Sequence, residues 1–252
     1  MKTKRRCELD KSYLRAYLLS LFVFFFISPF FALLLPPLLA LFIPFILQLG
    51  TFSLLYKERD EKVNLKTFIL LFLVSLTLLS FDSFCLSNFT YIGFKPLVFS
   101  YFFLIPVQTL SEEIIFRQLT LKLFASTDKK WLRALSILLS ATIFAIMHIA
   151  NPEAVDKLYL IYYFLWGLFA VLLTLYAGSI IPTFSFHLAN NLFIAVVMNY
   201  PDSALPVYSL FLKNEKPNLI HAVTFTFFSF LVITLIMIFL KKRSQYGKTE
   251  KN

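Results

Sequence analysis

Charged side chains are scarce in this chain of 252 residues. They make up 15% of the sequence, whereas a soluble domain of similar length carries about 25%. Hydrophobic residues make up 59%, and 32 of them are phenylalanine. This excess of hydrophobic residues is too large to be buried in one soluble core, because a folded domain of this size still needs a polar surface. The composition therefore excludes an ordinary soluble protein.

Cysteine, glycine and histidine are also rare. The two cysteines, Cys7 and Cys85, lie far apart with no Cys-x-x-Cys spacing, which argues against a disulfide framework and a thiolate metal site. Only five glycines are present, so we do not expect the many broken helices that are typical of transporters. With three histidines in the whole chain, the position of each one is informative.

Long apolar runs fill most of the chain. They are continuous and do not alternate with a period of two residues, as the strands of a membrane barrel do. A helix needs about 20 mainly apolar residues to cross a bilayer. We therefore predict a single all-α domain, residues 1–252, built as a polytopic transmembrane bundle of about eight spans. The predicted spans are 14–35, 37–56, 67–87, 97–125, 131–150, 158–176, 180–199 and 220–240.

Lysine and arginine predict the orientation of the bundle. With the N-terminus in the cytoplasm, 19 basic residues fall in cytoplasmic segments and four fall in the outer loops. An excess of this sign is expected because cytoplasmic loops are enriched in lysine and arginine. We therefore expect both termini in the cytoplasm. The net charge of +10 is then explained by membrane topology and does not indicate nucleic-acid binding.

Ionisable side chains inside a membrane span are costly and mark functional sites. Residues 111–118 read SEEIIFRQ and place Glu112, Glu113 and Arg117 within one predicted span. Glu113 and Arg117 are four residues apart, so they share a helical face and can pair. Glu112 lies about 100° around the helix from Glu113, and we expect it to face the centre of the bundle.

Two later spans carry histidine. His148 follows Phe144 by four residues, and His187 precedes Asn191 by four, so each pair shares one helical face. A carboxylate and an imidazole can together deprotonate a water molecule. An imidazole and an amide on one face can both donate hydrogen bonds to an oxyanion. The pattern therefore predicts amide hydrolysis by activated water, with no serine, threonine or cysteine nucleophile.

Simpler interpretations of the same residues stay open at this point. The acidic pair could be an interfacial cluster whose basic neighbours extend toward water. His148 could be an interfacial histidine, and His187 could join helices through hydrogen bonds. Asp82 and Asn190 have no partners at helical spacing, so we interpret them as an interfacial aspartate and a packing residue.

Taken together, three segments resemble the motifs of the CPBP family of intramembrane proteases, also called CAAX protease or Abi proteins. The family motifs are EExxxR, FxxxH and HxxxN. They stand here in the same order, as Glu112-Glu113-x-x-x-Arg117, Phe144-x-x-x-His148 and His187-x-x-x-Asn191. The resemblance covers a catalytic core at about residues 95–200.

The resemblance implies a role for each motif position. Glu112 and His148 would activate the attacking water, and His187 and Asn191 would form the oxyanion hole. The remaining motif residues would be supporting ones, namely Glu113, Arg117 and Phe144. Zinc favours three or four His, Cys or carboxylate ligands, and asparagine is a poor one. We therefore expect no metal or other cofactor, with zinc as the alternative.

These patterns favour a multi-pass membrane peptidase that cleaves a peptide or a membrane-protein substrate and binds lipid, not nucleic acid. The Phe-, Ile- and Lys-rich composition is typical of a bacterial protein, so we expect the bacterial plasma membrane. Two other classes stay open, a non-catalytic bacteriocin self-immunity protein and a proton-coupled transporter. On straight helices His187 would lie roughly 15 Å shallower than Glu112 and His148, and the sequence does not explain how they would meet.

Overall fold

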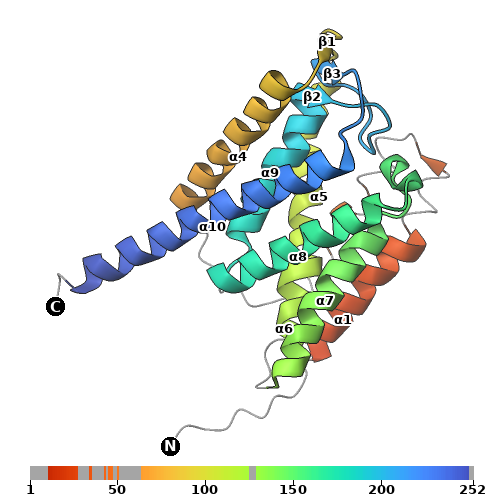
Figure 1. The fold of residues 1–252 in the computed structure, drawn as a ribbon. Helices are drawn as coiled ribbons and strands as arrows, with labels where there is room; N and C mark the ends of the chain where they lie inside the picture. Colours follow the sequence, from red (N-terminus) through yellow and green to blue (C-terminus); the bar gives the residue numbers. More distant parts are fainter. Residues whose placement is uncertain are drawn as a thin grey trace, which may run out of the picture.

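The computed structural model describes residues 11–27, 64–124 and 129–249, together with a few positions between residues 34 and 50. The described chain is mostly helical (Figure 1). The predicted span 37–56 lies mostly outside the described residues.

The α-helices differ widely in length. In chain order they are α1 (Lys11–Phe22), α4 (Leu65–Leu86), α5 (Val98–Glu113), α6 (Thr120–Phe124), α7 (Lys130–Met147), α8 (Tyr159–Ala177), α9 (Ile181–Leu192) and α10 (Leu219–Thr249). Short π-helical or 3-10 segments extend or join them, namely η1 (Val23–Ile27), η2 (Ile114–Leu119), η3 (Pro152–Val155) and η4 (Phe193–Val197). Because η2 joins α5 directly to α6, one long helix carries the acidic pair.

Five helices in the described part of the chain are long and apolar enough to cross a membrane. They are Leu65–Leu86, Val98–Leu123, Lys130–Met147, Tyr159–Ala177 and Leu219–Arg243. These helices confirm a polytopic helical membrane protein, and they correspond to five of the eight predicted spans. The predicted span 14–35 lies partly outside the described residues. The predicted span 180–199 corresponds to the shorter helix Ile181–Val197. Its length is about 25 Å at 1.5 Å per residue, which is less than the roughly 30 Å of a bilayer core.

Three short strands, which the sequence analysis did not predict, form a small sheet at one end of the bundle (Figure 1). They are β1 (Phe89–Tyr91), β2 (Met198–Asn199) and β3 (Phe211–Lys213), in the order β1-β3-β2. β1 runs antiparallel to β3, with Phe89 opposite Lys213, and β2 runs parallel to β3. The connections between helices leave backbone N–H and C=O groups without helical partners, and strand pairing satisfies some of them.

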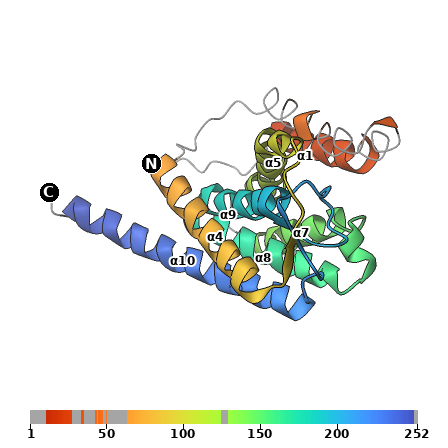
Figure 2. The same cartoon turned by 90° about the horizontal axis from the view of Figure 1, so that it is seen from above.

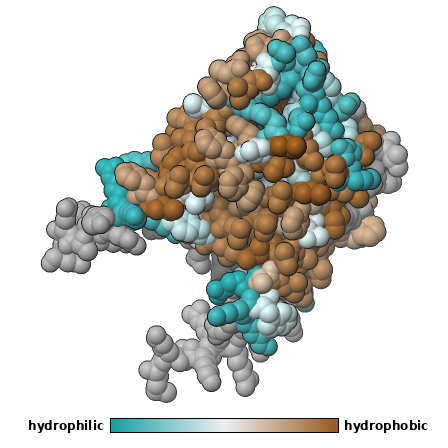
Figure 3. Space-filling model, in the orientation of Figure 1, coloured by the Kyte–Doolittle hydropathy of each residue, from teal (hydrophilic) through white to brown (hydrophobic). Residues whose placement is uncertain are grey.

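Apolar side chains cover much of the outer surface. Figure 3 shows a broad hydrophobic area between hydrophilic patches near the sheet and near the far ends of α6, α7 and α10. Large apolar side chains such as Leu73, Phe103, Leu138 and Phe239 are more than half exposed. A surface of this extent on a soluble protein would be an interaction site. Here it fits the lipid bilayer of a multi-pass membrane protein.

Gly178 sets the direction of the helix that carries His187. It adopts a left-handed conformation with φ of 74° and ends α8, and its N–H donates to the carbonyl of Thr174 at 2.8 Å. Glycine adopts this conformation at no steric cost. The chain then turns within three residues into α9, which has Pro182 in its first turn. Proline is favoured there because the first N–H groups of a helix have no partner within it.

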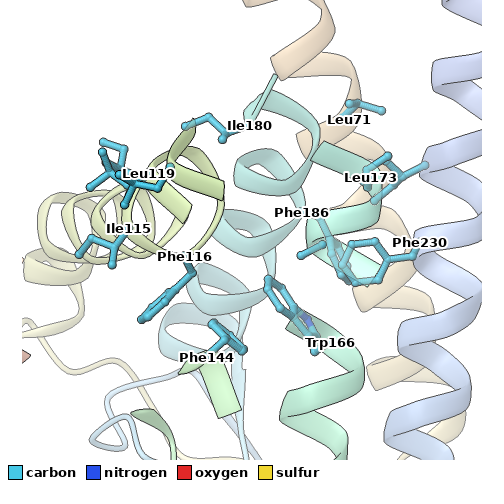
Figure 4. Packing of buried hydrophobic residues seen from close by; sticks show 14 of the residues in the cluster. Leu71, Ile115, Phe116, Leu119, Phe144, Trp166, Leu173, Ile180, Phe186 and Phe230 are labelled. Atoms are coloured by element: carbon cyan, nitrogen blue, oxygen red, sulfur yellow. The ribbon is translucent and has the colours of Figure 1, made fainter. Parts of the chain in front are cut away.

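α9 lies inside the bundle. It packs against α4, α5 and α8, and Figure 2 shows it among these three helices. Beside it, aromatic side chains from η2, α7, α8, α9 and α10 form the core (Figure 4). The rings of Phe144 and Trp166 stack with centroids 5.0 Å apart, and those of Phe186 and Phe230 meet edge to face at 4.9 Å. Phe144 and Trp166 of this core also lie next to polar residues of the candidate site.

Gly167→Ala is expected to destabilise the protein, because Gly167 lies where α8 meets α7 most closely. A Cβ atom at this position would lie 3.1 Å from Ala141 Cα and 3.3 Å from Phe144 Cδ1. Overfilling a packed contact costs about 1–3 kcal/mol, whereas glycine to alanine within a helix normally gains up to about 1 kcal/mol. Thermal unfolding in detergent checks the sign. A higher melting temperature for Gly167→Ala would contradict the tight contact.

Candidate active site

The acidic pair lies at the junction between α5 and η2. Glu112 and Glu113 are the last residues of α5, and their exposed fractions are 4% and 0%. π-helical segments such as η2 often occur at functional sites. The carbonyls of Ile115 and Phe116 accept hydrogen bonds from the hydroxyls of Thr120 at 3.0 Å and Ser140 at 2.5 Å. The burial of Glu112 and Glu113 excludes the interpretation of an interfacial cluster whose side chains extend toward water.

Arg117 is the largest fully buried side chain among the described residues. Its Nη1 lies 3.4 Å from Glu113 Oε1, so the pairing predicted from the four-residue spacing is confirmed. The guanidinium lies 4.4 Å from the ring centre of Phe144 and 5.1 Å from that of Trp166. Aromatic faces attract cations, and together with Glu113 they offset part of the cost of burying this charge.

His187 lies between the two carboxylates. Its Nδ1 is 2.8 Å from Glu113 Oε1, and its Nε2 is 3.7 Å from Glu112 Oε2. An ionised carboxylate can only accept a hydrogen bond, so Nδ1 is the donor to Glu113. The histidine therefore lies level with the acidic pair. The mismatch in depth disappears because α9 is a short helix within the bundle, and its first residue does not mark a membrane surface.

Glu112 has one occupied and one free carboxylate oxygen. Oε1 accepts from Gln108 Nε2 at 3.2 Å. Oε2 is buried and has no hydrogen-bond partner among the described residues. Its 3.7 Å separation from His187 Nε2 is too long for a direct hydrogen bond, but one water molecule can bridge two polar groups at such a separation.

His148 lies one residue beyond the end of α7. Its Nδ1 is 2.7 Å from the carbonyl oxygen of Phe144, and its ring centre is 4.4 Å from that of Phe144. The two side chains therefore share one helical face, as their four-residue spacing predicts, and their rings pack together. Phe144 also lies 6.1 Å from the ring of His187, so both histidines are next to the same phenylalanine. In the described part of the chain, no hydrogen bond or ion pair joins His148 to Glu112 or Glu113.

Asn191 lies one helical turn beyond His187 on α9. Its Oδ1 accepts from Asn190 Nδ2 at 3.1 Å, which leaves its NH₂ group as the available donor. Asn190, which we had interpreted as a packing residue, therefore orients the amide of its neighbour. Within the described residues, no hydrogen bond joins Asn191 to Glu112, Glu113 or His148.

Asp82, which we interpret as an interfacial aspartate, has partners outside its own helix. It is 6% exposed, and its carboxylate lies 2.7 Å from His221 Nε2 and 3.4 Å from Lys213 Nζ. These partners are 139 and 131 residues away in the sequence, so helical spacing could not reveal them. They form a second polar cluster at the end of the bundle that carries the sheet.

Several residues of the site were missed by the sequence analysis. Gln108 precedes Glu112 by four residues in an apolar helix, and this spacing could have identified it. Trp166 and Tyr163 carry no such signal, because α8 is apolar along nearly its whole length. The ring centre of Trp166 lies 4.5 Å from that of His187, and Tyr163 stacks on His148 at 4.2 Å.

The geometry does not fit the alternative of a zinc site. Zinc in proteins is held by three or four ligands of the His, Cys, Asp and Glu types. Among the described residues, no group of three such side chains is placed to hold a metal ion. The candidate ligands Glu113 and His187 are bound to each other through Glu113 Oε1 and His187 Nδ1. The same carboxylate oxygen also contacts Arg117.

Comparisons with known proteins agree with the motifs. Residues 94–193 match the family model of Rce1-like type II CAAX prenyl endopeptidases. A curated relative is the uncharacterized protein YyaK of Bacillus subtilis (strain 168), which is 27% identical over 170 residues. The aligned region covers 65% of this chain and 55% of that relative, so the chain spans about half the length of the curated relative it matches. No solved structure matches the chain.

Proposed function

Because residues 94–193 match the family model of Rce1-like type II CAAX prenyl endopeptidases, we propose that this protein is an intramembrane endopeptidase. It hydrolyses a peptide bond of a peptide or membrane-protein substrate with an activated water molecule. Its place is the bacterial plasma membrane, with both termini in the cytoplasm. The observation that supports this most directly is the free, buried Oε2 of Glu112, 3.7 Å from His187 Nε2.

Glu112 acts as the general base in this proposal. Its Oε2 takes a proton from a water molecule, whose oxygen then attacks the carbonyl carbon of the scissile bond. His148 assists the proton transfer. Its Nδ1 is bound to the Phe144 carbonyl, so Nε2 is the nitrogen that exchanges protons. The proton taken from the water is then delivered to the leaving amine of the substrate as the tetrahedral intermediate breaks down.

His187 and Asn191 stabilise the oxyanion. Because His187 Nδ1 donates to Glu113, Nε2 donates only when the ring carries both protons. Glu113 supplies the negative charge that stabilises this imidazolium, and Arg117 holds Glu113 in place at 3.4 Å. The amide N–H of Asn191 is the second donor. Donors fixed in advance at the position of the developing charge are usually the largest single contribution to catalysis.

A comparison of membrane peptidomes tests the proposal. Cells that produce the wild-type protein are compared with cells that produce Glu112→Gln at an equal level in the membrane. Peptide fragments found only with the wild type identify substrates. Identical peptidomes would reject the peptidase and favour a non-catalytic role, such as self-immunity.

Asn191→Ala is expected to lower turnover of such a substrate by about 10²–10³-fold, as loss of one oxyanion donor does elsewhere. The Michaelis constant should change little, because the donor acts on the transition state. Steady-state kinetics of the purified protein check this. Asn190→Ala keeps the Asn191 amide and is the matched control, with a smaller expected loss. An unchanged rate for Asn191→Ala would remove Asn191 from the oxyanion hole.

A further inference from the structure

The ring of His148 is held by two aromatic side chains and one carbonyl. Tyr163 in α8 stacks on it at 4.2 Å with an interplanar angle of 25°, and Phe144 lies at 4.4 Å with an angle of 45°. Nδ1 meets the Phe144 carbonyl at 2.7 Å. Because a carbonyl can only accept, Nδ1 carries the proton of the neutral ring. These contacts therefore fix both the ring plane and the tautomer.

Tyr163 is itself tied to the turn that follows His148. Its hydroxyl accepts a hydrogen bond from Asn151 Nδ2 at 3.1 Å. The backbone N–H of Asn151 donates to the His148 carbonyl at 3.1 Å. His148, Tyr163 and Asn151 are thus joined in a closed series of contacts.

Glu153 anchors this turn to the rest of the protein. It is 3% exposed, and its Oε1 accepts from the Tyr200 hydroxyl at 2.9 Å and from the Ala204 N–H at 3.0 Å. Burial, and then the nearby Glu153 carboxylate, raise the pKa of Tyr200, so its hydroxyl stays protonated as the donor. Lys216 Nζ donates to the Glu153 carbonyl at 3.0 Å. The turn is therefore held by two later segments of the chain, residues 200–204 and the segment around Lys216.

We propose that Tyr163, Asn151 and Glu153 form a brace that positions His148 for proton exchange. This inference rests on the proposed peptidase function, and none of the three residues belongs to the EExxxR, FxxxH or HxxxN motifs. They are positioning residues, since they act through His148. Their effect on rate can be large, because a displacement of about 1 Å in a catalytic arrangement can cost about 10²-fold.

Spectroscopy of the histidine rings tests the brace. The chain has three histidines, so isotope-labelled histidine gives few ring signals in an NMR spectrum, and substitution assigns them. Without the stacked Tyr163 ring, the imidazole of Tyr163→Leu should be able to turn away from the Phe144 carbonyl. The ring nitrogen signals of His148 should then report both neutral tautomers, while those of His187 and His221 stay unchanged. On a substrate from the peptidome comparison, Tyr163→Leu should lower kcat about 10- to 100-fold with little change in KM.

Two variants control for general damage. Tyr163→Phe keeps the stacked ring and loses only the acceptor for Asn151, so its effects on the His148 signals and on turnover should be present but smaller than those of Tyr163→Leu. Tyr176→Leu makes the same change as Tyr163→Leu on the same helix, at a tyrosine that contacts Lys241, and should leave all histidine signals in place.

The outcomes separate the brace from the proposed function. Unchanged His148 signals in Tyr163→Leu reject the brace, whether or not the protein cleaves peptides. If all three histidine signals move together, Tyr163 supports the whole bundle and the specific brace is also rejected. A shift confined to His148, in a protein that cleaves nothing, supports the brace and rejects the peptidase.

Discussion

Glu112→Gln is expected to lower peptide-bond cleavage by about 10²–10⁴-fold, the usual contribution of a general base. Glutamine has nearly the same shape, and its side-chain oxygen can still accept from Gln108. The loss would therefore reflect the missing proton acceptor and not a disturbed fold. Turnover of a substrate from the peptidome comparison, by purified protein in a bilayer, measures it.

Asp82→Asn is the matched control for this substitution. It makes the same acid-to-amide change at another buried carboxylate, one that contacts His221 and Lys213 and none of the motif residues. Its turnover should stay close to that of the wild type. Equal turnover in Glu112→Gln and the wild type would show that Glu112 is not the base and would remove the central claim of the mechanism.

Arg117→Met is expected to lower the free energy of unfolding by about 3–5 kcal/mol. Removing one partner of a buried ion pair leaves the other charge without compensation, and Glu113 is fully buried. Methionine fills much of the arginine volume, so the loss would come mainly from the Glu113 carboxylate, which keeps its contact with His187 but loses the guanidinium. Reversible unfolding of the protein in mixed micelles, monitored at several probe positions, gives this free energy.

The double variant Glu113→Gln with Arg117→Met removes both charges and should recover part of the loss. Lys241→Met is the surface control, since Lys241 lies over the ring of Tyr176 at 4.3 Å. An exposed cation–π contact of this kind contributes about 0.5–1 kcal/mol. If Arg117→Met lowered the free energy of unfolding no more than Lys241→Met does, the Glu113–Arg117 pair would not have the stabilising role assigned to it.

Contacts within one helix could be predicted from the sequence. The pairs Glu113–Arg117 and Phe144–His148 are four residues apart, and the structure brings both together. The helical geometry that relates such residues is the same in every helix. The catalytic roles of the motif residues stay predictions, since geometry alone does not measure turnover.

Contacts between helices could not be predicted in the same way. Spacing says which face of a helix a residue occupies, but not which helix lies opposite. Glu113 meets His187 across 74 residues of sequence, and Asp82 meets His221 across 139. The depth of His187 could not be predicted either, because no pattern in the sequence indicates that α9 is shorter than a bilayer core.

The small sheet has a mechanical consequence for the bundle. β1 follows α4, β2 follows the extension of α9, and β3 precedes α10. The paired strands therefore connect three helices at one rim of the bundle. Any sideways parting of these helices must pivot about that rim. The widest displacement would then occur at the opposite end, where no strands hold them within the described residues.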